Sequence, residues 1–313
     1  MTDITHTTEE PLDDARHDAD PVMDVGLAPE GYRLPADTRL GRVSLQIADL
    51  GRSLEYYQTV LGLRVLERSE SSALLGTVEG STALVELHER KGATAVPHHG
   101  RLGLYHFAIL LPDRASLGRF VAHLGEVGER IGASDHLVSE ALYLRDPDGL
   151  GIEVYRDRPR AEWRAQNRQV EMATEPLDLA GVARAGNGVR WVGMPAGTVM
   201  GHVHLHVGNL EQGAAFYHMG IGFDKMVWTY QGALFLAAGG YHHHLGINTW
   251  AGPRAPRATA GDARLLSWRI ILSSQADVTA TAASMKAAGF VVENDAGSIV
   301  ADDPWGTTVR IGR

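Results

Sequence analysis

The sequence repeats itself, and this repeat constrains the fold more than any other feature. The segment 41–63 (GRVSLQIADLGRSLEYYQTVLGL) aligns without a gap on the segment 201–223 (GHVHLHVGNLEQGAAFYHMGIGF), at a constant offset of 160 residues. Six positions are identical, including the glycine that opens each segment and the tyrosine near its middle. Self-similarity of this kind indicates a chain built from copies of one supersecondary unit.

Each copy begins with alternating apolar and polar residues, the pattern of a half-buried strand. Asp49 or Asn209 follows at a position suited to capping a helix, and Gly62 or Gly222 is suited to ending it. Further strand-like segments come next. The repeated unit therefore reads β-α-β-β-β.

Two weaker copies complete the pattern. Their first strands are predicted at 104–110 and 266–272, their helices at 114–127 and 276–288, and their closing strands after the turns of DPDGLGIEVY (146–155) and DPWGTTVRI (303–311). The sequence thus predicts four modules, at about 41–90, 102–156, 200–250 and 264–313. We predict an acidic, flexible leader (1–38), an N-terminal domain with modules 1 and 2 (39–156), a linker with a short helix near 177–184 (157–199), and a C-terminal domain with modules 3 and 4 (200–313).

Composition narrows the chemistry. The chain has no cysteine, which excludes disulfides, thiolate metal sites and a cysteine nucleophile, so any metal must be held by His, Asp or Glu. Most of the net charge of −9 lies in the first 40 residues, and the nearly neutral remainder gives no reason to expect nucleic-acid binding. No apolar run approaches the ~20 residues that span a bilayer, and no signal-peptide core is visible, so we expect a cytoplasmic protein without a membrane partner.

The four modules, together with the segments GHVHLHV, YHHHLGINTW and YLRDPDGLGIEVY, resemble the vicinal oxygen chelate superfamily. This superfamily includes glyoxalase I, bleomycin- and fosfomycin-resistance proteins and the extradiol dioxygenases, and the resemblance is greatest to its catechol 2,3-dioxygenase branch. It covers nearly everything from Arg39 to Arg313. It implies an α+β fold in which four βαβββ modules pair into two open-barrel cups, each offering positions on its first and last strands to one metal.

The ligand positions of that superfamily can be located in each module. The first-strand position holds Arg42, His106, His202 and Trp268 in modules 1 to 4, and the last-strand position, counted four residues after the turn glycine, holds Leu84, Glu153, His244 and Arg310. Only modules 2 and 3 carry ligand-type side chains. His106, His202 and Glu153 form a set of two imidazoles and one carboxylate, which suits iron(II) and also accepts manganese(II).

The resemblance also implies residues around the metal. It assigns acid–base work to His244 and hydrogen bonding of substrate or dioxygen-derived oxygens to Tyr143, ten residues before Glu153, and to His136. His136 lies seven residues before Tyr143, two fewer than the usual family interval. The alternative is that His136 is an ordinary turn residue without a role in the site. Strand alternation predicts His204, His242 and Asn248 on the substrate side, His243 toward a helix or solvent, and His206 as a buried structural donor.

We therefore predict a non-haem Fe(II)-dependent extradiol dioxygenase that opens a catechol-type ring with O2 and yields a semialdehyde. The alternatives are a glyoxalase-like metal-dependent isomerase or transferase, and a metal-free small-molecule-binding resistance protein on the same fold. The partners expected are a small aromatic diol and O2, with self-association of the chain open through exposed module edges.

One further prediction concerns how the modules pair. Pairing module 1 with 2 and module 3 with 4 would separate His106 and Glu153 from His202. Pairing module 2 with 3 gathers these residues in one cup and leaves modules 1 and 4 to form a second cup without metal. We predict the latter arrangement, with one metal per chain.

Overall fold

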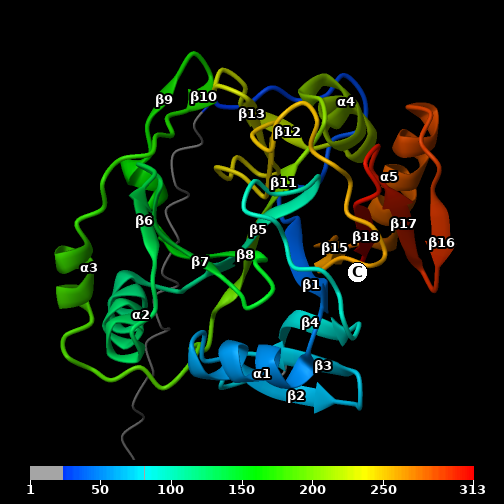
Figure 1. The fold of residues 1–313 in the computed structure, drawn as a ribbon. Coiled ribbons are helices and arrows are strands. Elements are labelled where there is room, and N and C mark those ends of the chain that lie inside the picture. The colour runs from blue at the N-terminus through cyan, green and yellow to red at the C-terminus, as the bar shows by residue number, and fades with distance from the viewer. Residues whose placement is uncertain (1–23, 81) are drawn as a thin grey trace, which may run out of the picture.

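The computed structural model describes residues 24–80 and 82–313, and Figure 1 shows their path. Most of the predicted leader lies outside these residues. Its last part, from residue 24 to 38, packs on the body of the protein: Leu34 is buried, and the guanidinium of Arg33 lies 2.6 Å from the carboxylate of Asp224. This part of the leader is therefore held in place by contacts with module 3.

All four predicted βαβββ modules are present, and the fold is α+β. Module 1 contains β1 (Arg39–Ile47), α1 (Leu50–Thr59), β2 (Arg64–Arg68), β3 (Ser72–Gly76) and β4 (Ala83–Glu89). Module 2 contains β5 (Gly103–Leu110), α2 (Arg114–Val127), β6 (Gly132–Asp135), β7 (Ser139–Arg145) and β8 (Gly151–Asp157). Module 3 contains β11 (Val199–His206), α4 (Leu210–Ala214) continued by the π-helix η2 (Ala215–Ile221), β12 (Asp224–Val227), β13 (Ala233–Ala237) and β14 (Leu245–Asn248). Module 4 contains β15 (Arg264–Ile271), α5 (Gln275–Ala287), β16 (Glu293–Asp295), β17 (Ser298–Asp302) and β18 (Thr308–Gly312).

The segment between modules 2 and 3 has structure of its own. It holds the 3-10 turn η1 (Arg160–Glu162), the short strands β9 (Ala165–Gln166) and β10 (Gln169–Val170), and the helix α3 (Leu179–Ala185). The helix lies close to the predicted range of 177–184 and packs on α2. This connection crosses from β8, at the end of module 2, to β11, at the start of module 3 (Figure 1).

The strands form two large curled sheets. One has the order β12-β13-β14-β11-β5-β8-β7-β6 and is here called the central cup; the other has the order β16-β17-β18-β15-β1-β4-β3-β2 and is called the terminal cup. Modules 2 and 3 thus share one sheet and modules 1 and 4 the other, which confirms the predicted pairing. Figure 1 shows blue β1 near orange β15 and red β18, and in the sheet β15 pairs with β1 on one side and with β18 on the other. The predicted domain boundaries follow the order of modules along the chain, whereas the sheets follow this pairing.

A polar residue in the sequence fixes where each of the four module helices begins. The side chains of Asp49, Asp113, Asn209 and Ser274 each accept a hydrogen bond from the backbone N–H three residues later, which satisfies one of the free donors at the helix start. Gly62, three residues after α1, and Gly222, directly after η2, both have positive φ, a backbone conformation in which glycine is favoured.

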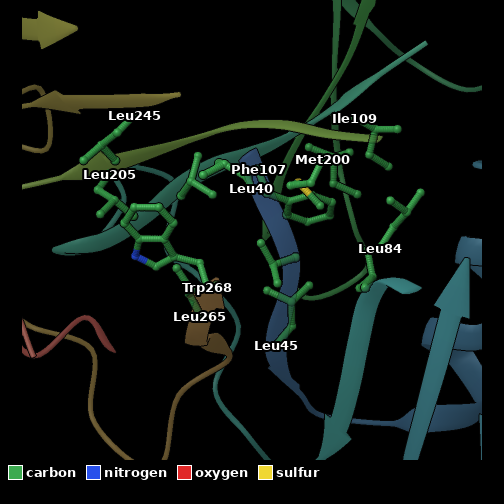
Figure 2. Packing of buried hydrophobic residues seen from close by; sticks show 14 of the residues in the cluster. Leu40, Leu45, Leu84, Phe107, Ile109, Met200, Leu205, Leu245, Leu265 and Trp268 are labelled. Carbon is green, nitrogen blue, oxygen red and sulfur yellow. The ribbon is translucent and has the colours of Figure 1, made fainter. Parts of the chain in front are cut away.

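The backs of the two cups share one hydrophobic core. Figure 2 shows part of it, where side chains of β1, β5, β11 and β15 belong to the same buried cluster. Val43 pairs with Trp268 in the terminal cup, and Phe107 pairs with Val203 in the central cup, and all four are fully buried. The alternate residues of these strands point into the cups, which is where the predicted site lies. Among the described residues, no helix is long and apolar enough to cross a membrane.

Candidate metal centre and active site

Three of the predicted ligands meet in the central cup. Nε2 of His106, on β5, and Nε2 of His202, on β11, each lie 3.0 Å from Oε2 of Glu153, on β8. All three side chains are buried, and their ligand atoms lie within 4.8 Å of one another. The antiparallel pairing of β5 with β11 and the parallel pairing of β5 with β8 bring these three strands side by side.

The donor set fits a divalent metal better than a set of hydrogen bonds. Among the described residues, Nε2 of His106, although buried and 3.0 Å from Glu153, has no hydrogen-bond partner with acceptable geometry, and neither has Nδ1 of His202. Burial opposes the charge of Glu153, but the two histidines outweigh it and hold the pKa of this carboxyl well below its usual range. A buried anionic oxygen facing two imidazole nitrogens matches the two-histidine, one-carboxylate ligand set of non-haem iron(II).

Strand register identifies the matching positions in all four modules. In module 2 the first ligand, His106, precedes the helix cap Asp113 by seven residues, and the residue five before that cap, Ala108, pairs with Glu153. In module 3 the helix cap is Asn209. The residue seven before this cap is His202, and the residue five before it, His204, pairs with Gly246. The last-strand position of module 3 is therefore occupied by a glycine. A Cβ at Gly246 would lie only 2.8 Å from the ring of His204, so this position is too crowded for a larger residue and supplies no side-chain ligand.

The predicted acid–base residue, His244, does not face the site. It lies outside the metal pocket, and its Nδ1 accepts a hydrogen bond of 3.2 Å from the backbone N–H of Ala238. Burial lowers its pKa to about 3. The prediction assumed that the strand begins before residue 244, but β14 begins at Leu245, and the position matched by register lies six residues after Gly240 and only four after Gly149. The assignment of His244 to the substrate side was wrong for this reason.

His243, which was expected to point away, lines the metal pocket instead. Its ring centroid lies 4.1 Å from that of His202. A hydrogen-bonded path leads from it into the protein: its Nδ1 lies 2.7 Å from Nδ1 of His242, whose Nε2 lies 2.9 Å from the carboxylate of Asp157. Since a carboxylate only accepts, His242 donates to Asp157 and accepts from His243. This leaves Nε2 of His243 as a free lone pair, and burial keeps the pKa of His243 low.

His136 and Tyr143 both reach the pocket, as predicted. Nδ1 of His136 donates to the carbonyl of Ala173 at 2.6 Å, so its Nε2 accepts from the hydroxyl of Tyr143, also at 2.6 Å. Burial, reinforced by the nearby charge of Glu153, raises the pKa of Tyr143 well above its usual range. Tyr143 therefore keeps its proton, which it donates to His136, and its hydroxyl oxygen remains as a hydrogen-bond acceptor beside the metal ligands.

The chain matches a family model described as "Glyoxalase/Bleomycin resistance protein/Dioxygenase superfamily" over residues 39–154. It is 43% identical to a catechol-2,3-dioxygenase of Bacillus subtilis (strain 168) over 271 residues, which are 86% of this chain and 94% of that protein. The chain belongs to the glyoxalase/bleomycin resistance/dioxygenase superfamily. Among solved structures, one from Bacillus subtilis subsp. subtilis str. 168 superposes with a TM-score of 0.62 at 13% identity, covering 90% of this chain and 86% of that one. Glyoxalase I of Zea mays superposes with a TM-score of 0.52 at 19% identity, covering 88% and 92%. Both share the fold.

The pocket in front of this superfamily site is small, about 230 Å³, and largely aromatic. Tyr105, Tyr230, Phe235 and Trp250 line it, and the segment 172–174 of the connection between modules 2 and 3 closes one side. The hydroxyl of Thr174 lies 3.1 Å from that of Tyr230, which joins this segment to module 3. None of these wall residues was predicted. Tyr105 could have been found as the neighbour of His106, but the segment 172–174 carries no sequence pattern that marks it.

The three residues predicted to bind substrate separate in the structure. His204 lines the pocket, and its Nε2 accepts from Nδ2 of Asn248 at 3.0 Å. Asn248 is fully buried outside the pocket lining, where its Oδ1 accepts from Nδ1 of His206 and from the backbone N–H of Trp250. His242 is also fully buried and faces Asp157. Asn248 and His242 therefore hold other side chains in place and do not face substrate, contrary to the prediction, and His206 has the structural role expected of it.

The terminal cup shows what the superfamily positions hold where the ligand set is absent. The same register count gives Arg42 and Glu86 in module 1, and Ser267 and Arg310 in module 4. Leu84 and Trp268, the residues predicted there, do not occupy these positions. Six residues separate Gly80 from Glu86, and Trp268 is fully buried on the opposite face of β15. Arg42 Nε lies 3.0 Å from Glu86, so a guanidinium neutralises this carboxylate.

Proposed function

We propose that the chain is an extradiol ring-cleavage dioxygenase that binds iron(II) through His106, His202 and Glu153 and opens a catechol-type ring with O2. The observation that carries the proposal is the buried set of three ligands facing an aromatic pocket that also holds an acid–base histidine. The similarity to a catechol-2,3-dioxygenase over most of both chains supports the same reaction class.

The ligand set supports this chemistry because it is incomplete as a coordination sphere. Three protein ligands leave positions open for a substrate, and Gly246 at the fourth matched position supplies no side chain. When bound, iron(II) would lower the pKa of the catechol hydroxyls and pass electrons between substrate and dioxygen. Manganese(II) suits the same ligands, so the choice of iron is part of the proposal.

The chain's own residues would handle protons. Nε2 of His243 has a free lone pair beside the ligands, so we assign it the removal of a proton from a catechol hydroxyl and the later return of a proton. The bonded path through His242 to Asp157 fixes the tautomer and stabilises the protonated ring. The hydroxyl of Tyr143 donates its proton to His136, so its oxygen would accept a hydrogen bond from a hydroxyl of the substrate.

The aromatic walls would orient the ring. Tyr105 and Trp250 lie with their ring centroids 5.8 Å apart in an edge-to-face arrangement, and Phe235 lies 5.0 Å from the ring of His243. Such surfaces favour a flat apolar ring, and the small pocket excludes bulk water from it. The ring would be held with its hydroxyls toward His106, His202 and Glu153.

An oxygen electrode and a spectrophotometer test the proposal together. Purified protein loaded anaerobically with iron(II) should consume one O2 per catechol and form a yellow ring-opened semialdehyde when a panel of catechols is added in air. Parallel loading with manganese(II) tests the choice of metal. Catechol conversion without O2 uptake, or no conversion with any catechol, would contradict the proposal; isomerisation of a thiol adduct without O2 would instead favour a glyoxalase-like enzyme.

A further inference from the structure

A second cavity lies on the seam between the two cups. It has a volume of about 390 Å³ and takes its walls from both sheets. Its floor is apolar, formed by Leu40, Leu84, Leu110, Met200 and Ile271. Its rim carries four arginines, Arg39, Arg42, Arg269 and Arg313. No aspartate or glutamate lines it among the residues that the structure describes.

The arginines of this seam pocket lack enough counter-charge. Within the described chain, Arg42 is paired with Glu86, whereas Arg39 and Arg269 make no ion pair and no side-chain hydrogen bond. The guanidiniums of Arg39, Arg42 and Arg269 thus have one nearby carboxylate between them, that of Glu86. Clustered like charges cost free energy unless an anion joins them. The arrangement therefore resembles an anion site without its anion.

Among the arginines of the seam pocket that the structure describes, Arg269 is the one whose Nε is a buried donor without an acceptor. It lies on β15 next to Arg42. Burial lowers its pKa, and the neighbouring positive charges of Arg42 and Arg310 add to this effect. A buried guanidinium donor that lacks an acceptor is costly in a folded protein. A carboxylate would accept from it and relieve the repulsion at once.

We propose that the seam pocket binds a small organic carboxylate with an apolar body. The guanidinium rim recognises the carboxylate, with Arg269 as the main donor, and the floor of leucine, isoleucine and methionine side chains covers the apolar part. Inorganic phosphate alone would leave this floor exposed, and an uncharged molecule would leave Arg269 unpartnered. The pocket is separate from the metal centre, although Tyr241 and His244 in its wall flank His242 and His243.

Calorimetric titration of the purified protein with hexanoate, hexanamide and inorganic phosphate tests this. Hexanoate should bind with one site per chain, about tenfold or more tighter than either of the others, and its affinity should fall between 50 and 500 mM NaCl. Equal binding of hexanamide would overturn recognition of the anion, equal binding of phosphate would overturn the role of the floor, and no binding of hexanoate would overturn the whole proposal.

Variants place the binding in the seam pocket. Arg269→Gln should weaken hexanoate binding about tenfold, as expected for one lost charged hydrogen bond, whereas Arg190→Gln, an exposed arginine outside the pocket, should leave it unchanged. Arg39→Gln offers a second test at an exposed position where folding is not at risk. Hexanoate binding that survives undiminished in both pocket variants would lie elsewhere and would overturn the proposal.

Discussion

In the central cup, Glu153 faces two imidazoles. In the terminal cup, Glu86 occupies the matching position, where it accepts one hydrogen bond of 3.0 Å from Arg42 and one of 2.8 Å from the hydroxyl of Ser44. Both carboxylates have a lowered pKa, because in each case the neighbouring donors outweigh the effect of burial. One difference is decisive: Glu153 is fully buried between groups that can coordinate a metal, while Glu86 is partly exposed and already neutralised by a group that cannot. The same module thus supports either a cluster of side chains that could hold a metal or an ion pair.

The largest effect expected is the loss of the metal from the central cup alone. Glu153→Gln should abolish stoichiometric metal binding and reduce O2 uptake below detection, because the site loses its only anionic ligand. Glu86→Gln, at the matching position of the terminal cup, should keep both. Elemental analysis and an oxygen electrode measure these properties. Full metal occupancy in Glu153→Gln would contradict the assignment.

The second prediction separates two neighbouring histidines. His243→Gln should retain its metal and lower kcat about 10²–10⁴-fold, the usual consequence of losing a general base. His244→Gln should keep a kcat close to the unaltered protein, because His244 faces the seam pocket. Steady-state kinetics with metal-loaded enzyme would decide this. Comparable losses in the two variants would mean that the turn before β14 positions these residues differently.

A smaller effect is expected from the tyrosine beside the ligands. Tyr143→Phe should lower kcat/KM about ten- to hundredfold, because it removes one hydrogen bond to a substrate hydroxyl beside the metal ligands. Tyr217→Phe removes a hydroxyl that bonds to Asp303, far from the pocket, and serves as the control. An effect on stability but not on kcat/KM in Tyr143→Phe would limit this residue to a structural role.

The comparison can also be tested by conversion. Replacing Arg42 and Ser267 by histidine would recreate two imidazoles around Glu86 in the terminal cup. We expect the double variant to bind a second metal per chain, about 10–100-fold more weakly than the first, because the surrounding hydrogen bonds that orient the ligands are missing. Metal titration in a variant that also carries Glu153→Gln isolates the new site. No binding there would mean that the ligand positions alone do not define a centre.

The smallest effect concerns the acid stability of the terminal cup. Because Glu86 has a lowered pKa in the folded protein, its contribution to stability is present above its ordinary pKa and is lost as pH falls through the lowered value. The contribution should be at most about 1 kcal/mol, since the ion pair is partly exposed. Denaturant unfolding of the unaltered protein and of Glu86→Gln between pH 6 and pH 3 should show a slightly shallower loss in the variant.

The sequence was sufficient for the fold and for the grouping of the three predicted ligands. The internal repeat gives the modules, and the resemblance to the superfamily gives the strand positions of His106, His202 and Glu153, which lie together in the structure. The two errors at last-strand positions share one cause: the matched residue lies six residues after Gly80 and after Gly240 but four after Gly149, which moves it from Leu84 to Glu86 and from His244 to Gly246. Turn length is not periodic, so no alternation pattern reports it.

Contacts made by irregular segments could not be predicted for a related reason. The segment 172–174 reaches the pocket only because the connection between modules 2 and 3 folds back across module 2, where Ala173 accepts from His136. Trp268 was misplaced because two consecutive leucines, Leu265 and Leu266, offer two equally plausible registers. Such choices are settled by packing: Trp268 fills the buried position opposite Val43.

The pairing of the modules has a consequence for how the protein forms during synthesis. The central cup is contiguous, so its last strand is available once the ribosome has released Asn248. In the terminal cup, Val43 on β1 pairs with Trp268, which is synthesised much later. Both edges of β1 are therefore unpaired at first, and β4 then pairs with one of them. Closure of this sheet requires contacts between the two ends of the chain, which are slow to form. The nascent chain can thus complete the central cup first, and an arrested or truncated product would expose β1 as a surface prone to aggregation.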